Sequence, residues 1–265
     1  MREVWFLLRQ NRGAMIGLFV VLVVTALAVI APMIAPADPA QVFPESLRAP
    51  PAWLDGGNWK FPLGTDDLGR DFLSRLIFGA RVSLIIGFLI VFVSTSVGTT
   101  LGLVAGSVGG KIDSFISRLM DVIMALPSIL LAIVIVAVIG PGFFNTVLAV
   151  SVVSLPGIVR VVRSSVMVEK NKNYVVASKS FGGNWFRIFV IGVLPNCMAP
   201  LLVQATLGFS NGILDAAALG FFGLGRATAH TRLGNDAFRW TVIHRIGDSF
   251  GDLSGNLYFV GGIGF

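Results

Sequence analysis

Long uncharged hydrophobic runs, separated by short polar segments, dominate this chain. The runs cover residues 13–37, 82–110, 122–159 and 188–214. A helix needs about 20 apolar residues to cross the hydrocarbon core of a membrane, so each run is long enough for at least one crossing. The run 122–159 is long enough for two crossings, and the tripeptide Gly140-Pro141-Gly142 supplies a break between them.

These runs predict an all-α integral membrane protein, a bundle of about five transmembrane helices. Helices are favoured over strands because the runs lack period-2 alternation and because lipid tolerates no open sheet edge. Pro127 predicts a kink in the third span. The spans are expected at about 14–36 and 83–106, then ending near 139 and near 160–163, and finally at about 196–218.

Charge changes this picture only by giving the bundle an orientation. The net charge is +6, yet only 13% of the residues are charged, and the basic ones flank the predicted spans. Such flanking charge sets membrane orientation and does not indicate nucleic-acid binding. Residues 1–12 carry three arginines against one acid, which predicts a cytoplasmic N-terminus. The single cysteine, Cys197, gives neither a disulfide nor a metal cluster.

A proline-rich segment, 37–63, follows the first span and therefore lies on the outer face. It contains Trp53 and Trp59, and extended proline-rich chain with tryptophan is typical of a membrane-interface loop. The segment is longer than a simple connector, which indicates a role of its own.

A polar motif comes next, and it comprises Gly64, Thr65, Asp66, Asp67, Gly69, Arg70 and Asp71. Its carboxylate spacing does not fit an EF-hand calcium loop. A helix start fits better, with Thr65 or Asp66 as the cap and Asp71 paired with Arg75. Residues 70–81 then predict an amphipathic helix that lies on the membrane surface.

The segment 165–192 is the strongest polar interruption between the later spans. Its charged residues, from Glu169 to Arg187, lie on both sides of the Gly182-Gly183 pair. This pattern predicts a short helix, a glycine turn and a second helix that re-enters the membrane. A segment kept outside the bilayer in this way indicates a surface for a partner, and a plain inter-helix loop is the alternative.

The spacing within 174–195 resembles the EAA loop of ABC-importer permeases, which in that family docks into a groove of a cytoplasmic ATPase. Ala177, Gly182, Leu194 and Pro195 match, whereas valine, serine and glycine replace the usual Glu, second Ala and Ile at 176, 178 and 192. The resemblance implies an ATPase-coupling loop that includes Tyr174, Val176, Ala177, Ser178, Gly182, Leu194 and Pro195.

The stretches G-T-D-D-L-G-R-D at 64–71 and L-R-A-P-P-A-W at 47–53 resemble the dipeptide, oligopeptide and nickel branch of these permeases. The resemblance covers about 1–225 and is strongest to the permease that forms the C partner of a heterodimer. It implies a cytoplasmic N-terminus at 1–12 and a permease domain over 13–225. Within that domain it implies a periplasmic loop at 37–81 and a cytoplasmic coupling loop at 165–192.

The same resemblance implies the setting and the partners. It predicts a multi-pass protein of the bacterial inner membrane that moves dipeptides or short peptides, with no cofactor of its own. A homologous permease, a pair of ATP-binding subunits and a periplasmic peptide-binding protein would complete the transporter. Peptide length and side-chain preference stay open, and nickel or glutathione are alternative solutes.

Catalytic motifs are absent from the sequence. It has no G-x-x-x-x-G-K-[ST] phosphate loop and no H-E-x-x-H, and its histidines, His230 and His244, form no metal constellation. The chain is therefore predicted not to be an enzyme, so energy for uphill transport must come from a partner. A secondary carrier is the alternative from another class, but carriers show internal repeats and charged midplane residues, and we find neither.

Three acids lie beside or within apolar segments. Asp215 lies near the outer end of the fifth span, away from the midplane. An acid within a span is a candidate for the transport pathway, and a local structural role in reach of water is the alternative. Asp113 and Asp121 lie near the start of the third span, where a solvated helix start or a conformational relay would explain them.

The segment 226–265 departs from the family pattern, because it lacks an apolar run near the ~20 residues of a sixth span. The family continues here with A-Q-P-P-T-P-[DE]-W-G-T-M-L. One permitted codon spelling of residues 226–238, read one base later, gives A-Q-P-P-T-P-D-W-G-T-M-L. Our hypothesis is a frameshift or a sequencing error near codon 226, which would leave this segment unselected and this product poorly assembled.

Resequencing the gene around codon 226 tests this hypothesis. We expect the DNA to spell the family segment in the shifted frame. A sequence that does not would leave the divergent segment in need of another explanation.

Overall fold

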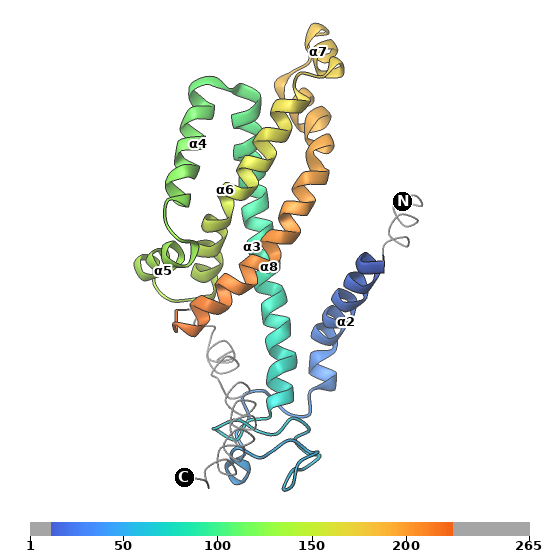
Figure 1. The fold of residues 1–265 in the computed structure, drawn as a ribbon, viewed down its shortest axis with the longest axis vertical. Coiled ribbons are helices and arrows are strands. Elements are labelled where there is room, and N and C mark those ends of the chain that lie inside the picture. The colour runs from blue at the N-terminus through green and yellow to red at the C-terminus, as the bar shows by residue number, and fades with distance from the viewer. Residues whose placement is uncertain (1–11, 225–265) are drawn as a thin grey trace, which may run out of the picture.

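The computed structural model describes residues 12–224, and within that range it contains helices and no strands (Figure 1). This confirms the predicted all-helical bundle. The α-helices are α2 (Arg12–Ile34), α3 (Phe72–Val108), α4 (Gly110–Met124), α5 (Ser128–Ile139), α6 (Phe143–Glu169), α7 (Asn173–Ser180) and α8 (Met198–Phe221). Two 3₁₀ segments, η1 (Pro44–Ser46) and η3 (Leu194–Cys197), and the π-helix η2 (Arg187–Val193) complete the set.

Within residues 12–224, four helical stretches are long and apolar enough to cross a membrane: α2, α3, α6 and the continuous stretch Arg187–Phe221. A fifth crossing results if α4 and α5 count as one span, which is bent by 94° between them. Pro127 lies at this bend as the residue before α5, in agreement with the predicted kink. Gly140, with φ of +98°, ends α5 and allows the chain to reverse into α6.

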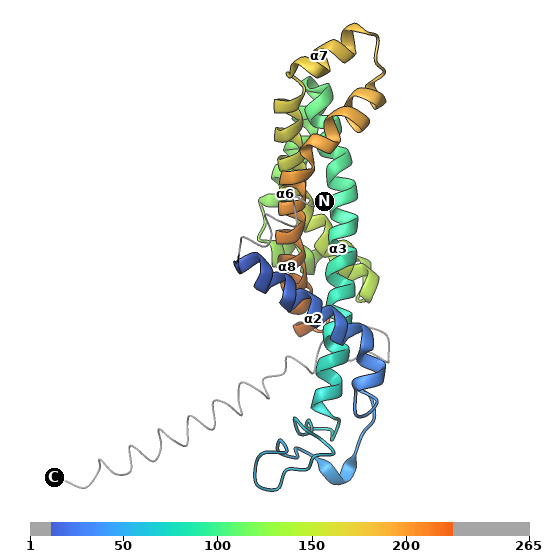
Figure 2. The same ribbon diagram turned by 90° about the vertical axis from the view of Figure 1, so that its right-hand side faces the viewer.

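The centre of the bundle is the contact between α3 and α6, beside which α8 also packs (Figures 1 and 2). Gly98, Gly102 and Gly106 form a stripe along α3. A methyl group added at each would lie 2.8 Å from Ile158, Val162 or Val166 of α6, respectively. Small residues at this spacing allow helix backbones to approach closely, which drives association in lipid, where the hydrophobic effect does not.

Two predicted boundaries are wrong. Residues 72–81 are the first turns of α3, and the separate surface helix at 70–81 does not exist. No proline interrupts 72–108, and Gly79 has open space around it, so nothing ends the helix there. At 37 residues α3 is about 55 Å long, which exceeds the ~30 Å hydrocarbon core and extends the helix beyond the membrane. Helix α6 likewise continues past Arg163 to Glu169.

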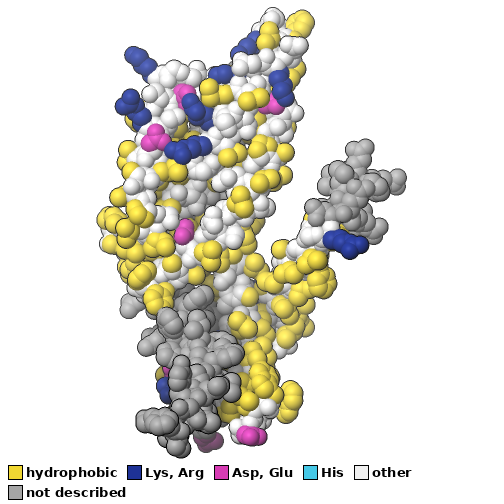
Figure 3. Space-filling view, viewed as in Figure 1, with side chains coloured by type: hydrophobic (Ala, Val, Ile, Leu, Met, Phe, Trp, Pro, Cys, Tyr) yellow, Lys and Arg dark blue, Asp and Glu magenta, His cyan; other side chains and the backbone are white. Residues whose placement is uncertain are grey.

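The two polar regions singled out from the sequence lie at opposite ends of the molecule. Helix α7 forms one tip of the bundle, and the loop between α2 and α3 forms the other end (Figures 1 and 2). Lys and Arg side chains gather at the α7 end, around α4, α6 and α7, while hydrophobic side chains cover the middle (Figure 3). This arrangement agrees with a cytoplasmic α7 and a periplasmic α2–α3 loop. Residues 1–11 of the cytoplasmic N-terminus predicted at 1–12, and the divergent segment 226–265, lie outside the described residues, while Arg12 begins α2.

Cysteine labelling tests this orientation. Both Glu45, in the α2–α3 loop, and Lys172, just before α7, are exposed, whereas the native Cys197 is buried and should not react. In intact cells, an impermeant thiol reagent should modify the Glu45→Cys variant only. The Lys172→Cys variant should react only in inside-out vesicles. The reverse pattern would contradict the orientation.

Candidate functional site

Helix α7 has one buried residue and an exposed outer surface. Val175 is 0% exposed and packs in a cluster with Val166 of α6 and with Ile188 and Phe189 of η2. Its neighbour Val176 is 54% exposed, and Ala177 is also exposed. One side of this short helix is therefore fixed to the bundle, and the other is available to a partner.

The turn after α7 is built on Gly182, as the sequence predicted. Its φ of +74° lies in the left-handed region, which favours glycine. The Gly182 N–H donates to the Lys179 carbonyl at 2.9 Å, and the Gly183 N–H donates to the Ser178 carbonyl at 2.9 Å. These bonds satisfy carbonyls at the helix end. The turn leaves Phe181 91% exposed at the tip of the molecule.

A polar network fixes the start of α7 to the end of α6. The Glu169 carboxylate accepts hydrogen bonds from Lys172 Nζ at 2.6 Å and from the Tyr174 hydroxyl at 2.8 Å. Asn196 Nδ2, in η3, donates to the same hydroxyl at 3.2 Å. The hydrogen bond to Glu169 raises the pKa of Lys172, and burial together with the bond to Glu169 raises the pKa of Tyr174. Tyr174 therefore joins α6, α7 and η3.

Further contacts join this end of the molecule to α3 and α4. Lys170 Nζ donates to the Gly106 carbonyl at 2.9 Å, and Trp185 Nε1 donates to Ser107 Oγ at 3.2 Å. Arg163 of α6 forms a two-pronged ion pair with Asp113 of α4, with Nη2 at 2.7 Å from Oδ2. Arg160 pairs with Asp121 at 2.6 Å. Asp113 and Asp121 are thus the α4 partners of α6 arginines.

The predicted coupling residues do not form a single surface. Residues 174–182 lie together on α7 and its turn, but Leu194 and Pro195 belong to η3 in the re-entering helix. Leu194 is half-buried, and Pro195 occupies the first turn of η3, where its missing N–H costs least. The anchors Lys170, Trp185 and Asn196 were not predicted, because their partners are 64, 78 and 22 residues away in the sequence. Glu169 was also missed, although the three-residue spacing to Lys172 is a signal that could have indicated it.

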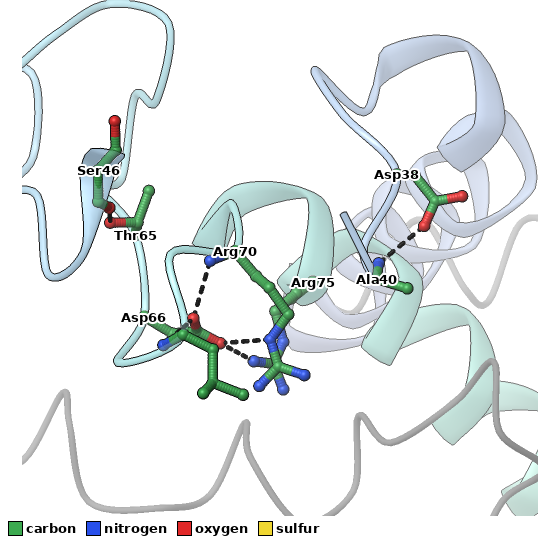
Figure 4. Close-up of polar contacts among 8 residues, drawn as sticks. Asp38, Ala40, Ser46, Thr65, Asp66, Arg70 and Arg75 are labelled. Atoms are coloured by element: carbon green, nitrogen blue, oxygen red, sulfur yellow. Dashed lines mark hydrogen bonds and ion pairs between the residues drawn. The ribbon is translucent and has the colours of Figure 1, made fainter. Parts of the chain in front are cut away.

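The outer motif is a compact knot of hydrogen bonds centred on Asp66 (Figure 4). The Asp66 carboxylate accepts from the Arg70 backbone N–H and Nε, both at 2.8 Å, and from Arg75 Nη1. Burial alone would raise the pKa of Asp66, but the hydrogen bonds from Arg70 and Leu68 and the charge of Arg75 together outweigh it and hold that pKa below its ordinary value. This carboxylate therefore stays ionised between two arginines.

The predicted roles of three motif residues are wrong. Asp71 caps α3, since its Oδ2 accepts from the Ser74 N–H at 2.8 Å. Thr65 instead ties the loop together, as its Oγ1 accepts from the Ala49 N–H at 2.8 Å. Arg75 pairs with Asp66 in place of Asp71. Asp66 lies too far before the helix to cap it, because the turn 66–70 intervenes.

The other motif residues shape and border the knot. Gly64 and Gly69 have φ of +79° and +75°, and a methyl group on either would lie 2.3 Å from a carbonyl oxygen of the preceding loop. Asp67 forms an exposed ion pair with Arg48 at 2.8 Å. Asp215, the pathway candidate, lies far from this knot in the sequence and borders a cavity beside α8.

The sequence of this chain matches the models of two protein families. Residues 98–261 match the family model described as the binding-protein-dependent transport system inner membrane component. Residues 1–51 match the N-terminal TM domain of oligopeptide transport permease C. The first match extends to residue 261 and so includes most of the divergent segment 226–265. It does not test the frameshift hypothesis, which stays a prediction.

Several curated relatives are similar over most of the chain. The dipeptide transport system permease protein DppC of Escherichia coli K12 is 55% identical over 85% of this chain and 75% of its own length. The di/tripeptide transport system permease protein DppC of Pseudomonas aeruginosa is 53% identical over 85% of this chain and 74% of its own. The peptide transport system permease protein SapC of Escherichia coli O6:H1 is 37% identical over 85% and 76%.

A solved structure shares the fold. An inward-facing MetNI methionine ABC transporter matches with a TM-score of 0.56 and 19% identity, over 71% of this chain and 91% of the matched one. Membership of the family means that this chain is a transport subunit of an ABC importer, not an enzyme, and that it works with ATPase and substrate-binding partners. The chain belongs to the inner membrane components of binding-protein-dependent transport systems.

Proposed function

We propose that this chain is the permease subunit of an importer for dipeptides and other short peptides. The names of its relatives support this substrate class, since those 53% and 55% identical are dipeptide or di/tripeptide permeases and the 37% relative is a peptide permease. Nickel and glutathione are the alternative solutes. Family membership does not favour a secondary carrier.

In this proposal α7 and its turn form the docking surface for a cytoplasmic ATPase. The observation that carries the proposal is the division of α7 into a fixed and a free side. Val175 is buried, whereas Val176 and the fully projecting Phe181 expose apolar surface at the tip. Exposed apolar side chains at a water-facing tip are unfavourable unless a partner covers them.

A push on α7 would move the bundle because α7 is fixed to several helices at once. Tyr174 joins it to α6 and η3, and Lys170 and Trp185 connect the adjoining chain to the end of α3. Arg163 extends the connection to α4 through Asp113. Displacement by the ATPase would thus reach α3, α4, α6 and η3 at the cytoplasmic end, and coupled movement of several helices is what a conformational cycle requires.

The remaining partners are a homologous permease, which would complete a heterodimer, and a periplasmic peptide-binding protein. The α2–α3 loop suits the second role. Its exposed Trp53, Leu54 and Trp59 give it apolar contact surface, and the Asp66 knot holds its base to α3. Aromatic side chains are enriched in protein interfaces.

ATP-dependent uptake of radiolabelled dipeptide into vesicles that contain the assembled transporter tests this proposal. We expect uptake of a dipeptide, and we expect the Gly182→Asp variant to lose most of it. A side chain at the positive φ of Gly182 costs about 1 kcal/mol of strain, too little to unfold the bundle. The side chain and its charge would instead separate the docked surfaces.

Gly109→Asp is the matched control. Gly109 also lies at the cytoplasmic end, with φ of +72° and open space around it, but it joins α3 to α4 and is not part of α7. This variant adds the same charge, and its backbone strain is not smaller, because Gly109 combines its positive φ with a ψ of −161°, a conformation that side chains rarely adopt. It should nevertheless retain uptake, since it lies outside α7. Normal uptake by Gly182→Asp would contradict the docking role of α7. Uptake of nickel or glutathione but no dipeptide by the unmodified transporter would contradict the substrate.

A further inference from the structure

The amide and carboxyl side chains of α8, Gln204, Asn211 and Asp215, lie on one side of the helix, whereas its hydroxyl residues Thr206 and Ser210 lie on the other. Gln204, Gly208, Asn211 and Asp215 are spaced by four, three and four residues, which places them in line along one helix face. Polar side chains in a membrane span are costly when they face lipid, so a line of them indicates a face that meets water, protein or a ligand.

This face borders a cavity of about 350 Å³ between α6, α8 and the start of α5. The volume lies within the range of roughly 300–1,000 Å³ that small-molecule sites occupy. Ser128 of α5 and Ser154 of α6 add hydroxyl groups to the lining. The Ser154 hydroxyl already donates a hydrogen bond to the Val150 carbonyl at 2.9 Å. The cavity therefore presents carboxylate, amide and hydroxyl groups beside the apolar side chains of Val153, Ile158 and Leu214.

The wall opposite Gln204 fits its amide closely. Gly157 of α6 faces this side chain, and a methyl group added at Gly157 would lie 2.9 Å from Gln204 Nε2. Any larger residue at 157 would displace the amide. Glycine at this position thus allows Gln204 to lie against α6 at the edge of the cavity.

The Asp215 carboxylate has no hydrogen bond or ion pair from any residue in the part of the chain that the structure describes. Within 12–224, neither lysine nor arginine lines the cavity. An ionised carboxylate at membrane depth without a counter-charge is unfavourable. A cationic group that enters the cavity would therefore find in Asp215 a carboxylate that residues 12–224 leave without a counter-charge.

We propose that this cavity is a transient binding site on the transport pathway, in which Asp215 accepts the α-ammonium group of a peptide. The proposal rests on the peptide function above and names the residues that would hold the substrate. Gln204 and Asn211 would bind the peptide's backbone groups through their amides. Every peptide with a free N-terminus carries an α-ammonium group and a backbone. Such a site would therefore bind peptides with little selectivity for their side chains.

Protection of an introduced thiol tests the site. Gly208 lines the cavity with nothing within 4 Å of an added Cβ, so Gly208→Cys fits without strain. The transporter complex is purified in detergent without its peptide-binding protein and with the buried Cys197 changed to alanine. A small neutral thiol reagent then modifies the new cysteine at a rate that is measured with dialanine, with N-acetyl-dialanine and with neither.

Dialanine should slow the modification, whereas N-acetyl-dialanine, which lacks the ammonium group, should not. Adding Asp215→Asn should weaken the protection by dialanine roughly tenfold or more, the value of a lost hydrogen bond to a charged group. Asp121→Asn is the matched control, because Asp121 pairs with Arg160 on the α4 side and does not line the cavity. It should leave the protection unchanged.

Equal protection by both peptides, no protection by either, or protection that survives Asp215→Asn would each overturn the proposal. A thiol that never reacts would also overturn it, since the cavity would then be filled by a neighbouring subunit. The comparison of the two peptides uses intact Asp215, so it holds even if Asp215→Asn fails to assemble. Dipeptide uptake without selective protection would refute this site alone, whereas absence of dipeptide uptake would refute the proposed substrate.

Discussion

The close contact of α3 with α6 is the constraint on which the rest of the structure depends. Gly98, Gly102 and Gly106 leave room for the branched side chains of α6 to lie directly against the α3 backbone. In lipid, where burial of apolar surface contributes little, such close van der Waals packing is the main force that holds helices together. Because α6 leads straight into α7, this contact also fixes where α7 stands.

The polar contacts at the cytoplasmic end extend that constraint to the neighbouring helices. The Gly106 carbonyl, at the end of the glycine stripe, accepts from Lys170 next to α7. Glu169 and Tyr174 then orient α7, and the ion pair of Arg163 with Asp113 holds α4 beside α6. The α7 tip and the Asp215 cavity therefore border one connected body, since α6 and α8 form walls of that cavity.

The sequence predicted the features that depend on local pattern. The uncharged runs predicted the membrane spans, Pro127 predicted the bend before α5, and Gly182 predicted the turn after α7. It failed where partners are distant in the chain. Arg163 and Asp113 are 50 residues apart, and nothing in their spacing indicates a contact. At the outer motif, several acids and arginines lie within a few residues, so Asp66 and Asp71 were locally equivalent partners for Arg75. Only the turn 66–70 decides between them.

The central claim is that the α7 tip is the surface on which the ATPase acts. Replacing Phe181 with the photoreactive p-benzoylphenylalanine changes one exposed aromatic residue for another at that tip. Phe144, exposed at the far end of α6, is the matched position for comparison. Illumination of the assembled transporter should give a covalent adduct with the ATPase from position 181 and none from position 144. No ATPase adduct from position 181, or equal adducts from both, would contradict the account.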